Sequence, residues 1–229
     1  MKKLQFATGE IYHIYNRGVE KRDVFMNDGD YFRFMHDLYE FNDEAPAESS
    51  YYKLSALQSY EVRPRRVPRR PLVDIIAYCL MPNHFHILLR QRVELGIVRF
   101  MQKLGGYTMY FNQRHERVGA LFQGRSRAVH VSNERHLLYL PHYIHLNPLD
   151  LVEPGWRKQE LKDRDRALAF LDSYRWSSYL DYTGKKNFPS ILSLDLFHQL
   201  YGTPEEYSRS LREWLMNMDL GSLRGLTFD

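Results

Sequence analysis

Hydrophobic and polar positions follow two periods along this chain, one typical of strands and one typical of helices. Strand-like runs cover residues 11–16, 72–80, 84–90 and 128–131, and a weaker run covers 51–57. Apolar residues recur at helical spacing over 30–42, 95–111, 133–147 and 204–218. Pro82 and Asn83 separate the second and third strands and predict an antiparallel hairpin. Helices interspersed with such a hairpin predict an α+β fold, with helices packed on an antiparallel sheet.

The domain organisation follows from breaks in this pattern. Residues 1–155 carry the predicted sheet and form the predicted main domain, and residues 156–229 are expected to be a C-terminal helical appendage. The stretch 43–71 mixes acidic, Ser/Tyr and Pro/Arg segments and is interpreted as a long basic insertion. The appendage is expected to pack on the main domain or to contact a partner.

Composition narrows the class of protein. With 229 residues and 44% hydrophobic content, the chain can bury a sizeable core. Its single cysteine, Cys79, lies in an apolar run and is expected to be a small core residue. No apolar stretch has the length of a membrane span and no signal-peptide core follows the N-terminus, so we expect a cytoplasmic protein without membrane contact. The net charge of +4 and the clustered arginines suggest an anionic partner, nucleic acid first.

Two histidines one residue apart are the most informative local feature. His84 and His86 flank Phe85 within a strand-like run, so both imidazoles are expected on one face of the strand. There they could grip one divalent metal ion. The alternative is a pair of half-buried histidines with ordinary hydrogen bonds.

A second chemical element lies in the helix predicted to end near Pro148. Tyr143 and Asn147 are four residues apart and therefore share a helix face. If that face is turned toward His84 and His86, Asn147 could supply a third, oxygen ligand, and Tyr143 would stand beside the metal. The alternative is that Tyr143 packs in the core with its hydroxyl satisfied.

Five motifs in a fixed order give the chain a family resemblance that covers about residues 8–182. It resembles the REP-associated tyrosine transposases of the HUH single-tyrosine superfamily, which are IS200-like. The motifs are Tyr12-His13-Ile14-Tyr15-Asn16-Arg17-Gly18, Met81-Pro82-Asn83-His84-Phe85-His86-Ile87-Leu88, Gly119-Ala120-Leu121-Phe122-Gln123-Gly124-Arg125, Tyr143-Ile144-His145-Leu146-Asn147-Pro148 and Trp176-Ser177-Ser178-Tyr179. Two positions depart from the pattern: Ser126 stands where an aromatic residue is more usual, and Pro141 lies two residues before Tyr143.

The resemblance implies a ferredoxin-like HUH nuclease domain that acts on single-stranded DNA, often at hairpins of the REP type. By this resemblance, His84 and His86 match the family's metal-binding pair and Tyr143 matches its nucleophile. Asn147 falls where the family places its third polar ligand. It further implies attack that leaves a 5′-phosphotyrosine and a free 3′ hydroxyl, so that the strand can be rejoined. The protein would act as a monomer or a homodimer.

The chemistry itself explains why such residues belong together. A tyrosine hydroxyl with an ordinary pKa near 10 is a poor nucleophile at neutral pH, so it needs a metal that binds the scissile phosphate and stabilises the transition state. Mixed nitrogen and oxygen ligands suit Mg²⁺ or Mn²⁺, of which Mn²⁺ tolerates imidazole better.

Basic and aromatic residues outside this set are candidates for DNA binding. Arginines around Phe122 and Gln123 suit phosphate contacts and stacking on an unpaired base, although a surface loop closed by ion pairs is the alternative. Arginines among the prolines of 63–70 could grip a hairpin stem, or form a solvated basic loop. The full set is Arg17, Lys21, Arg65, Arg66, Arg69, Arg70, Arg117, Phe122, Gln123, Arg125 and Arg127.

Three functions from different classes therefore remain open. The first is the DNA strand transferase, the second is a hairpin-binding regulator of the same fold that does not cut, and the third is a metal-dependent hydrolase of small molecules. The complete set of histidine, tyrosine and asparagine side chains disfavours the second, and the basic, aromatic-rich segments disfavour the third.

Overall fold

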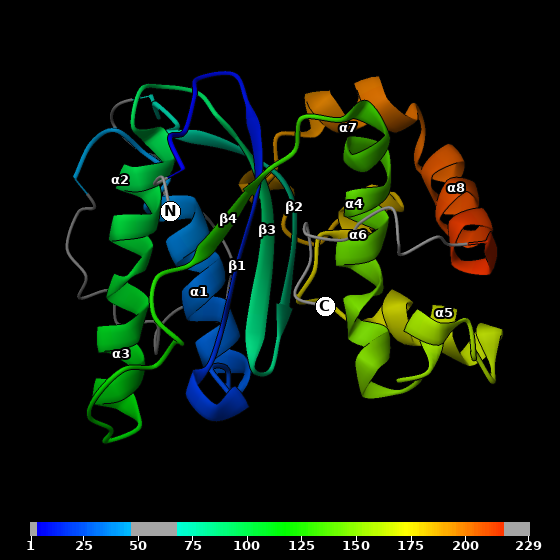
Figure 1. Cartoon of the computed structure of the whole chain (residues 1–229), viewed down its shortest axis with the longest axis horizontal. Helices are drawn as coiled ribbons and strands as arrows, with labels where there is room; N and C mark the ends of the chain where they lie inside the picture. Colours follow the sequence, from blue (N-terminus) through cyan, green and yellow to red (C-terminus); the bar gives the residue numbers. More distant parts are fainter. Residues whose placement is uncertain (1–3, 47–67, 218–229) are drawn as a thin grey trace.

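A four-stranded antiparallel sheet forms the centre of the molecule (Figure 1). The computed structural model describes residues 4–46 and 68–217. The strand order is β2-β3-β1-β4, with the bounds β1 Ile11–Arg17, β2 Val73–Met81, β3 His84–Gln91 and β4 Arg127–His130. The four main strands and the α+β class predicted from the sequence are confirmed, whereas the weaker run over 51–57 lies outside the described residues.

One face of the sheet is covered by the helices that connect the strands (Figure 1). These are α1 Asp28–Glu40, α2 Gly96–Leu104 and α3 Gly106–Arg114. The long helix predicted after β3 is two helices that meet at Gly105, where the glycine pair weakens helix propensity. With the strand order above, the connections β1-α1-β2 and β3-α2-α3-β4 give the ferredoxin-like arrangement that the resemblance implied.

The opposite face is covered by α4 and the C-terminal helices (Figure 1). Asn133 caps α4 by accepting a hydrogen bond from the Arg135 backbone N–H, and the helix runs through Pro141. The helices of this face are α4 Glu134–Leu146, α5 Arg164–Ser173, α6 Tyr179–Tyr182, α7 Leu194–Tyr201 and α8 Pro204–Asn217. Short 3₁₀ turns connect several elements: η1 Val19–Lys21, η3 Asn147–Leu151, η4 Trp156–Lys158 and η5 Pro189–Ile191.

The C-terminal segment packs against the main domain and closes the edge of β2. The Trp176 carbonyl accepts from the Leu80 N–H at 2.9 Å, and the Ser178 N–H donates to the Tyr78 carbonyl at 3.0 Å. The Trp176 ring stacks on Tyr31 at 4.5 Å. The expected boundary after residue 155 lies just before η4, and the core on this face contains side chains from both sides of it. None of the helices among the described residues is both long and apolar enough to cross a membrane.

A cluster of aromatic rings between α4 and α8 encloses a histidine. His142 is 1% exposed, and its ring lies 5.1 Å from that of Tyr207 and 5.9 Å from that of Trp214. Neither ring nitrogen has a hydrogen-bond partner within the described ranges 4–46 and 68–217. Burial lowers the pKa of His142 from 6.5 to about 3, so the ring is neutral in the folded protein.

Replacing His142 with phenylalanine is expected to change how stability depends on pH. The folded state holds this group neutral down to about pH 3 whereas the unfolded chain protonates it near pH 6.5. Preferential protonation of His142 in the unfolded state therefore costs no stability above pH 6.5 and destabilises the fold as pH falls toward 3, by on the order of 1 kcal/mol per pH unit. We expect H142F to flatten acid destabilisation in that window and to raise neutral-pH stability by about 1 kcal/mol. Urea unfolding at several pH values tests this, and an unchanged pH slope would contradict it.

Candidate active site

His84 and His86 project from β3 toward α4, on the face opposite the connecting helices. Their side chains are 5% and 0% exposed, and their ring centres lie 5.1 Å apart. Phe85 between them points into the core on the other face. The expectation that both imidazoles share one face of a strand is confirmed.

The Nδ1 atom of each histidine is engaged by a neighbouring side chain. His84 Nδ1 lies 2.6 Å from Asn83 Oδ1, and His86 Nδ1 lies 2.9 Å from His13 Nε2. Such contacts fix the orientation of a ligating imidazole and assign ligation to Nε2. The role of His13 was missed from the sequence, although it lies in one of the quoted motifs. Only the pairing of β1 with β3 shows that it stands beside His86.

Both histidines are held in the neutral form, which is the form that binds metals. Burial, with a smaller contribution from Arg17, lowers the pKa of His84 to about 4. Burial, followed by electrostatic interaction with His13 and then with His84, lowers the pKa of His86 well below 6.5. Arg17 pairs directly opposite His84 in the sheet, which explains its influence.

Tyr143 and Asn147 face these histidines from the end of α4. The Tyr143 ring meets His86 edge to face at 5.9 Å and is 1% exposed. Asn147 Nδ2 donates to the Tyr143 backbone carbonyl at 2.7 Å, and the Asn147 side chain is also a hydrogen-bond partner of His84. The structure therefore brings together all four residues that the sequence analysis singled out for metal binding and nucleophilic attack.

An arginine that the sequence analysis did not single out joins this group. Arg157 Nη1 donates to the Tyr143 hydroxyl at 2.9 Å, and Arg157 Nη2 donates to Asn147 Oδ1 at 3.0 Å. Arg157 is itself paired with Asp150. No spacing rule links residue 157 to residue 143, because they meet only after the chain has turned through η3 and η4.

The donor set fits a divalent metal ion that accepts mixed ligands. The set comprises two neutral imidazoles and one amide oxygen, and a metal here would replace the present contact between His84 and Asn147 while Arg157 keeps its own. Among the described residues no group of three His, Cys, Asp or Glu side chains forms a metal site. A metal here would thus depend on the amide of Asn147 as the third ligand.

Several predicted DNA-binding residues converge beside the turn that precedes His84. The Arg17 carbonyl accepts from the Gln123 N–H at 2.9 Å, and the Asn83 side chain donates to the Lys21 carbonyl at 3.1 Å. Phe122 packs edge to face on Phe85 at 5.6 Å, and Gln123 and Lys21 are exposed. The chain around Arg17 and Gln123 and the chain around Lys21 and Asn83 thus lie side by side at one rim of the site, whereas the Phe122 ring packs with Phe85 on the opposite face of the sheet.

The remaining arginines of this group lie in the connection from α3 to β4 and at the start of β4. Arg125 and Arg127 are exposed at the start of β4, and Arg127 pairs opposite Tyr15. Arg117 lies 5.7 Å from the Phe111 ring and is half-buried. Ser126, which departs from the family pattern, receives a contact from the Asn16 side chain at 3.4 Å. That these arginines bind DNA stays a prediction.

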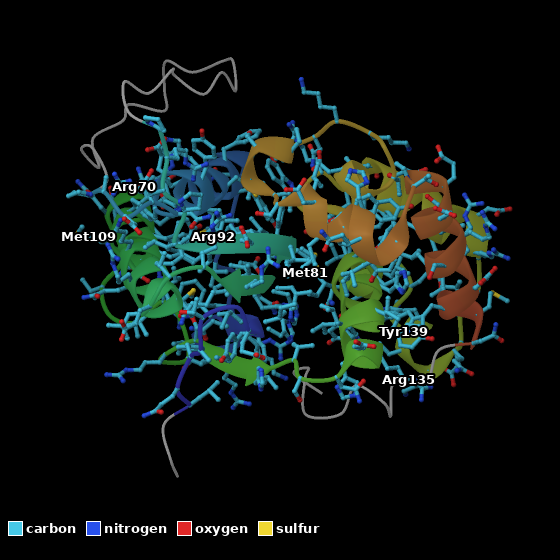
Figure 2. All side chains as sticks on the ribbon, turned by 90° about the horizontal axis from the view of Figure 1, so that it is seen from above. Arg70, Met81, Arg92, Met109, Arg135 and Tyr139 are labelled. Carbon is cyan, nitrogen blue, oxygen red and sulfur yellow. The ribbon has the colours of Figure 1, made fainter. Side chains whose placement is uncertain are left out.

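The arginines of the predicted basic run, 63–70, differ in their surroundings. Arg65 and Arg66 lie outside the described residues. Arg69 stacks on the Tyr39 ring at 3.7 Å and donates to the carbonyls of Tyr39 and Asn42, so it satisfies the end of α1. Arg70 is exposed, and in Figure 2 it lies at the end of the molecule away from α4, which carries the labelled Arg135 and Tyr139.

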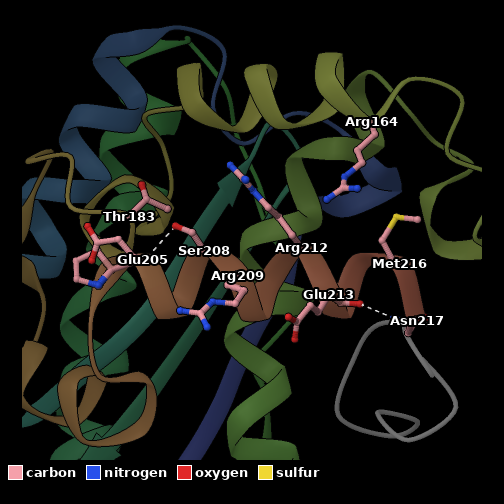
Figure 3. A pocket seen from close by; sticks show the side chains of 10 residues that line it. Arg164, Thr183, Glu205, Ser208, Arg209, Arg212, Glu213, Met216 and Asn217 are labelled. Carbon is pink, nitrogen blue, oxygen red and sulfur yellow. Dashed lines mark hydrogen bonds between the residues drawn. The ribbon is translucent and has the colours of Figure 1, made fainter.

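A surface groove with a volume of about 650 Å³ lies along α8, separate from this site (Figure 3). Arg164, Arg209 and Arg212 line it together with Glu205 and Glu213. None of the predicted site residues lines it.

Two comparisons with known proteins found similarities. Residues 57–147 match the family model described as transposase IS200 like. The solved structure of a REP-associated tyrosine transposase bound to a REP hairpin superposes with a TM-score of 0.51 at 11% identity, over 84% of this chain and 90% of that chain. No curated protein matches the chain. The resemblance drawn from the motifs is confirmed by the family match, and the fold by the solved structure.

Arg69 and Arg70 make a matched test of the basic run. Replacing Arg69 with alanine removes two hydrogen bonds to carbonyls and a cation–π contact, so we expect a loss of about 1–2 kcal/mol in the free energy of unfolding. Within the described residues the recorded side-chain contact of Arg70 is an exposed ion pair with Glu44 at 3.8 Å, so R70A is expected to cost at most about 0.5 kcal/mol. Urea denaturation measures both values. Equal losses would show that the α1 contacts of Arg69 contribute nothing to stability.

Proposed function

From the match to the IS200-like transposase family, we propose that this chain cleaves and rejoins single-stranded DNA at or near a hairpin, with Tyr143 as the nucleophile. The single observation that supports this most strongly is the meeting of Tyr143 and Asn147 with His84 and His86 across the gap between α4 and β3. Arg157 donates to the Tyr143 hydroxyl and the neutral His86 imidazole lies beside its ring, which suits a nucleophile next to a bound metal.

The proposed reaction is a phosphoryl transfer between oxygen atoms. The Tyr143 oxygen forms a bond to phosphorus, and the bond from phosphorus to the 3′ oxygen breaks. The proton lost by the phenol is balanced by the proton gained by the leaving 3′ hydroxyl, and a 5′-phosphotyrosine remains. Because the phosphodiester energy is kept in that ester, a 3′ hydroxyl can attack it and rejoin the strand.

A divalent metal, Mg²⁺ or Mn²⁺, would be held by His84, His86 and Asn147. When bound, such an ion supplies charge neutralisation at the scissile phosphate. The chain itself keeps the imidazoles neutral through burial and orients them through Asn83 and His13. These residues would thus provide a preformed site rather than one assembled by the substrate.

The substrate is proposed to be a hairpin with a single-stranded extension. The rim formed by Arg17, Lys21 and Gln123 adjoins the histidine pair, which suits contacts to phosphates and to an unpaired base. A regulator of the same fold that binds hairpins without cutting would use this rim alone, and a hydrolase of small molecules would use neither the rim nor the phosphotyrosine.

The decisive experiment is covalent capture. The protein is incubated with Mn²⁺ and a library of single-stranded oligonucleotides in which a hairpin is flanked by randomised segments, and adducts are separated on denaturing gels. We expect an adduct for the wild type, none for Y143F, and hairpin affinity within a few fold in both, because binding is spread over many phosphate contacts.

A matched control for Y143F is Y139F. Tyr139 lies one turn earlier on α4, where its ring stacks on Trp214 and neighbours His142, and no contact to His84 or His86 is seen among the described residues. Y139F is expected to form the adduct as the wild type does. An adduct formed by Y143F would show that another residue is the nucleophile. Hairpin binding without any adduct in the wild type would support the non-cleaving regulator.

The metal assignment is tested by H84A and H86A. Each is expected to slow adduct formation by about 100-fold or more and to weaken Mn²⁺ binding, which electron paramagnetic resonance follows without DNA. H130A is the control, because His130, at the end of β4, is partly exposed and paired with Glu10. Wild-type rates and Mn²⁺ affinity in both variants would show that the metal, if used, binds elsewhere.

A further inference from the structure

Arg157 contacts Tyr143 on α4 and Asn147 directly after it, both of which the proposed reaction uses. Its Nη1 donates to the Tyr143 hydroxyl and its Nη2 donates to Asn147 Oδ1, at 2.9 Å and 3.0 Å. We propose that Arg157, held in place by Asp150, is a positioning residue that orients the Tyr143 hydroxyl for attack. This inference rests on the proposed function and adds a residue to it.

The guanidinium is fixed from several directions. Its Nε and Nη2 donate to the two oxygens of Asp150 at 3.0 Å and 2.8 Å, in the paired geometry that arginine and carboxylate prefer. Asp150 also accepts from the indole N–H of the fully buried Trp156 at 2.6 Å. Arg157 therefore has little freedom to turn away from Tyr143.

Aromatic rings complete this enclosure. The guanidinium carbon lies 4.7 Å from the Trp156 ring centre and 5.0 Å from the Tyr143 ring centre. Its side chain is 20% exposed, so the group is partly shielded from water. Electrostatic and hydrogen-bond contacts are worth more in such a place than on an open surface.

The direction of the hydrogen bond has a chemical consequence. A tyrosine hydroxyl has one proton to donate, and arginine can only donate. The bond from Arg157 therefore occupies a lone pair of the Tyr143 oxygen, and the proton of that oxygen must point away from the guanidinium. The same cation is within reach of Asn147, so it sets the position of the nucleophile relative to a proposed ligand.

This arrangement differs from a merely structural ion pair in what it predicts. An ion pair between Arg157 and Asp150 alone would affect folding and leave the adduct rate per folded molecule unchanged. A positioning role affects the rate of adduct formation while leaving hairpin affinity nearly unchanged, because only one of many contacts to the DNA complex is altered.

The test compares R157A and R157K with K158A, using the same hairpin library and Mn²⁺. Single-turnover adduct rates and hairpin dissociation constants are measured on folded protein. We expect R157A to slow adduct formation by about 10- to 100-fold with affinity within about three-fold, the size expected for losing a hydrogen bond from a charged group. R157K keeps the positive charge but lacks the planar guanidinium that donates to two partners at once. Its adduct rate is expected to lie between those of R157A and the wild type.

Chemical rescue separates positioning from support of the fold. Added guanidinium ion at millimolar concentration is expected to restore part of the adduct rate of R157A and to leave K158A unaffected. Lys158 is the adjacent cation and is exposed, so K158A is the matched charge control. A faster rate in R157A would show that Arg157 restrains Tyr143 instead, and an unchanged rate would overturn the proposal.

A double-mutant cycle between R157A and Y143F keeps this inference distinguishable from the proposed function. It is measured by urea unfolding without DNA, and we expect the two effects on the unfolding equilibrium constant to depart from multiplicativity by about five-fold or more. If the wild type forms no adduct, the proposed function fails whatever the cycle shows. If the adduct forms but no coupling is found, the contact between Arg157 and Tyr143 is absent in solution and the positioning role fails.

Discussion

The antiparallel register between β1 and β3 decides which side chains meet α4. Tyr15 pairs with His86 and Arg17 pairs with His84, so His13, His84 and His86 all stand on the face that α4 covers. A shift of one residue would turn both histidines into the opposite core, because successive side chains of a strand alternate between faces. The candidate metal ligands, their hydrogen-bond partners and the approach of Tyr143 all depend on this register.

Burial of that face gives the histidines their chemical state. The segment after α4 folds back on the sheet, and its hydrogen bonds at the β2 edge place α5 to α8 around α4. The enclosed imidazoles have lowered pKa values because a charged ring would lose its hydration there. The C-terminal segment thus contributes to the candidate site through the environment it creates as well as through Arg157.

Polar side chains in this region hold one another in fixed pairs. His13 orients His86, Asn83 orients His84, and Asp150 orients Arg157. A reaction that requires an oxygen atom to meet phosphorus in line gains most from such fixed groups, because misplacement by about 1 Å can cost about 100-fold in rate. The structure therefore favours a preorganised site over one that forms on binding.

The sequence by itself determined the four main strands and the helices α1, α4 and α8. It also determined that His84 and His86 share a strand face and that Tyr143 and Asn147 share a helix face. Those features are local, because strand and helix periods and a proline-containing turn act over a few residues. Only the tertiary structure decided that the two faces meet, that His13 stands behind His86, and that Arg157 reaches Tyr143. It also showed that Arg69 contacts the end of α1, while its binding to DNA stays a prediction. Such contacts join residues far apart along the chain, and their formation depends on strand register and on the path of the turns after α4, which no local period specifies.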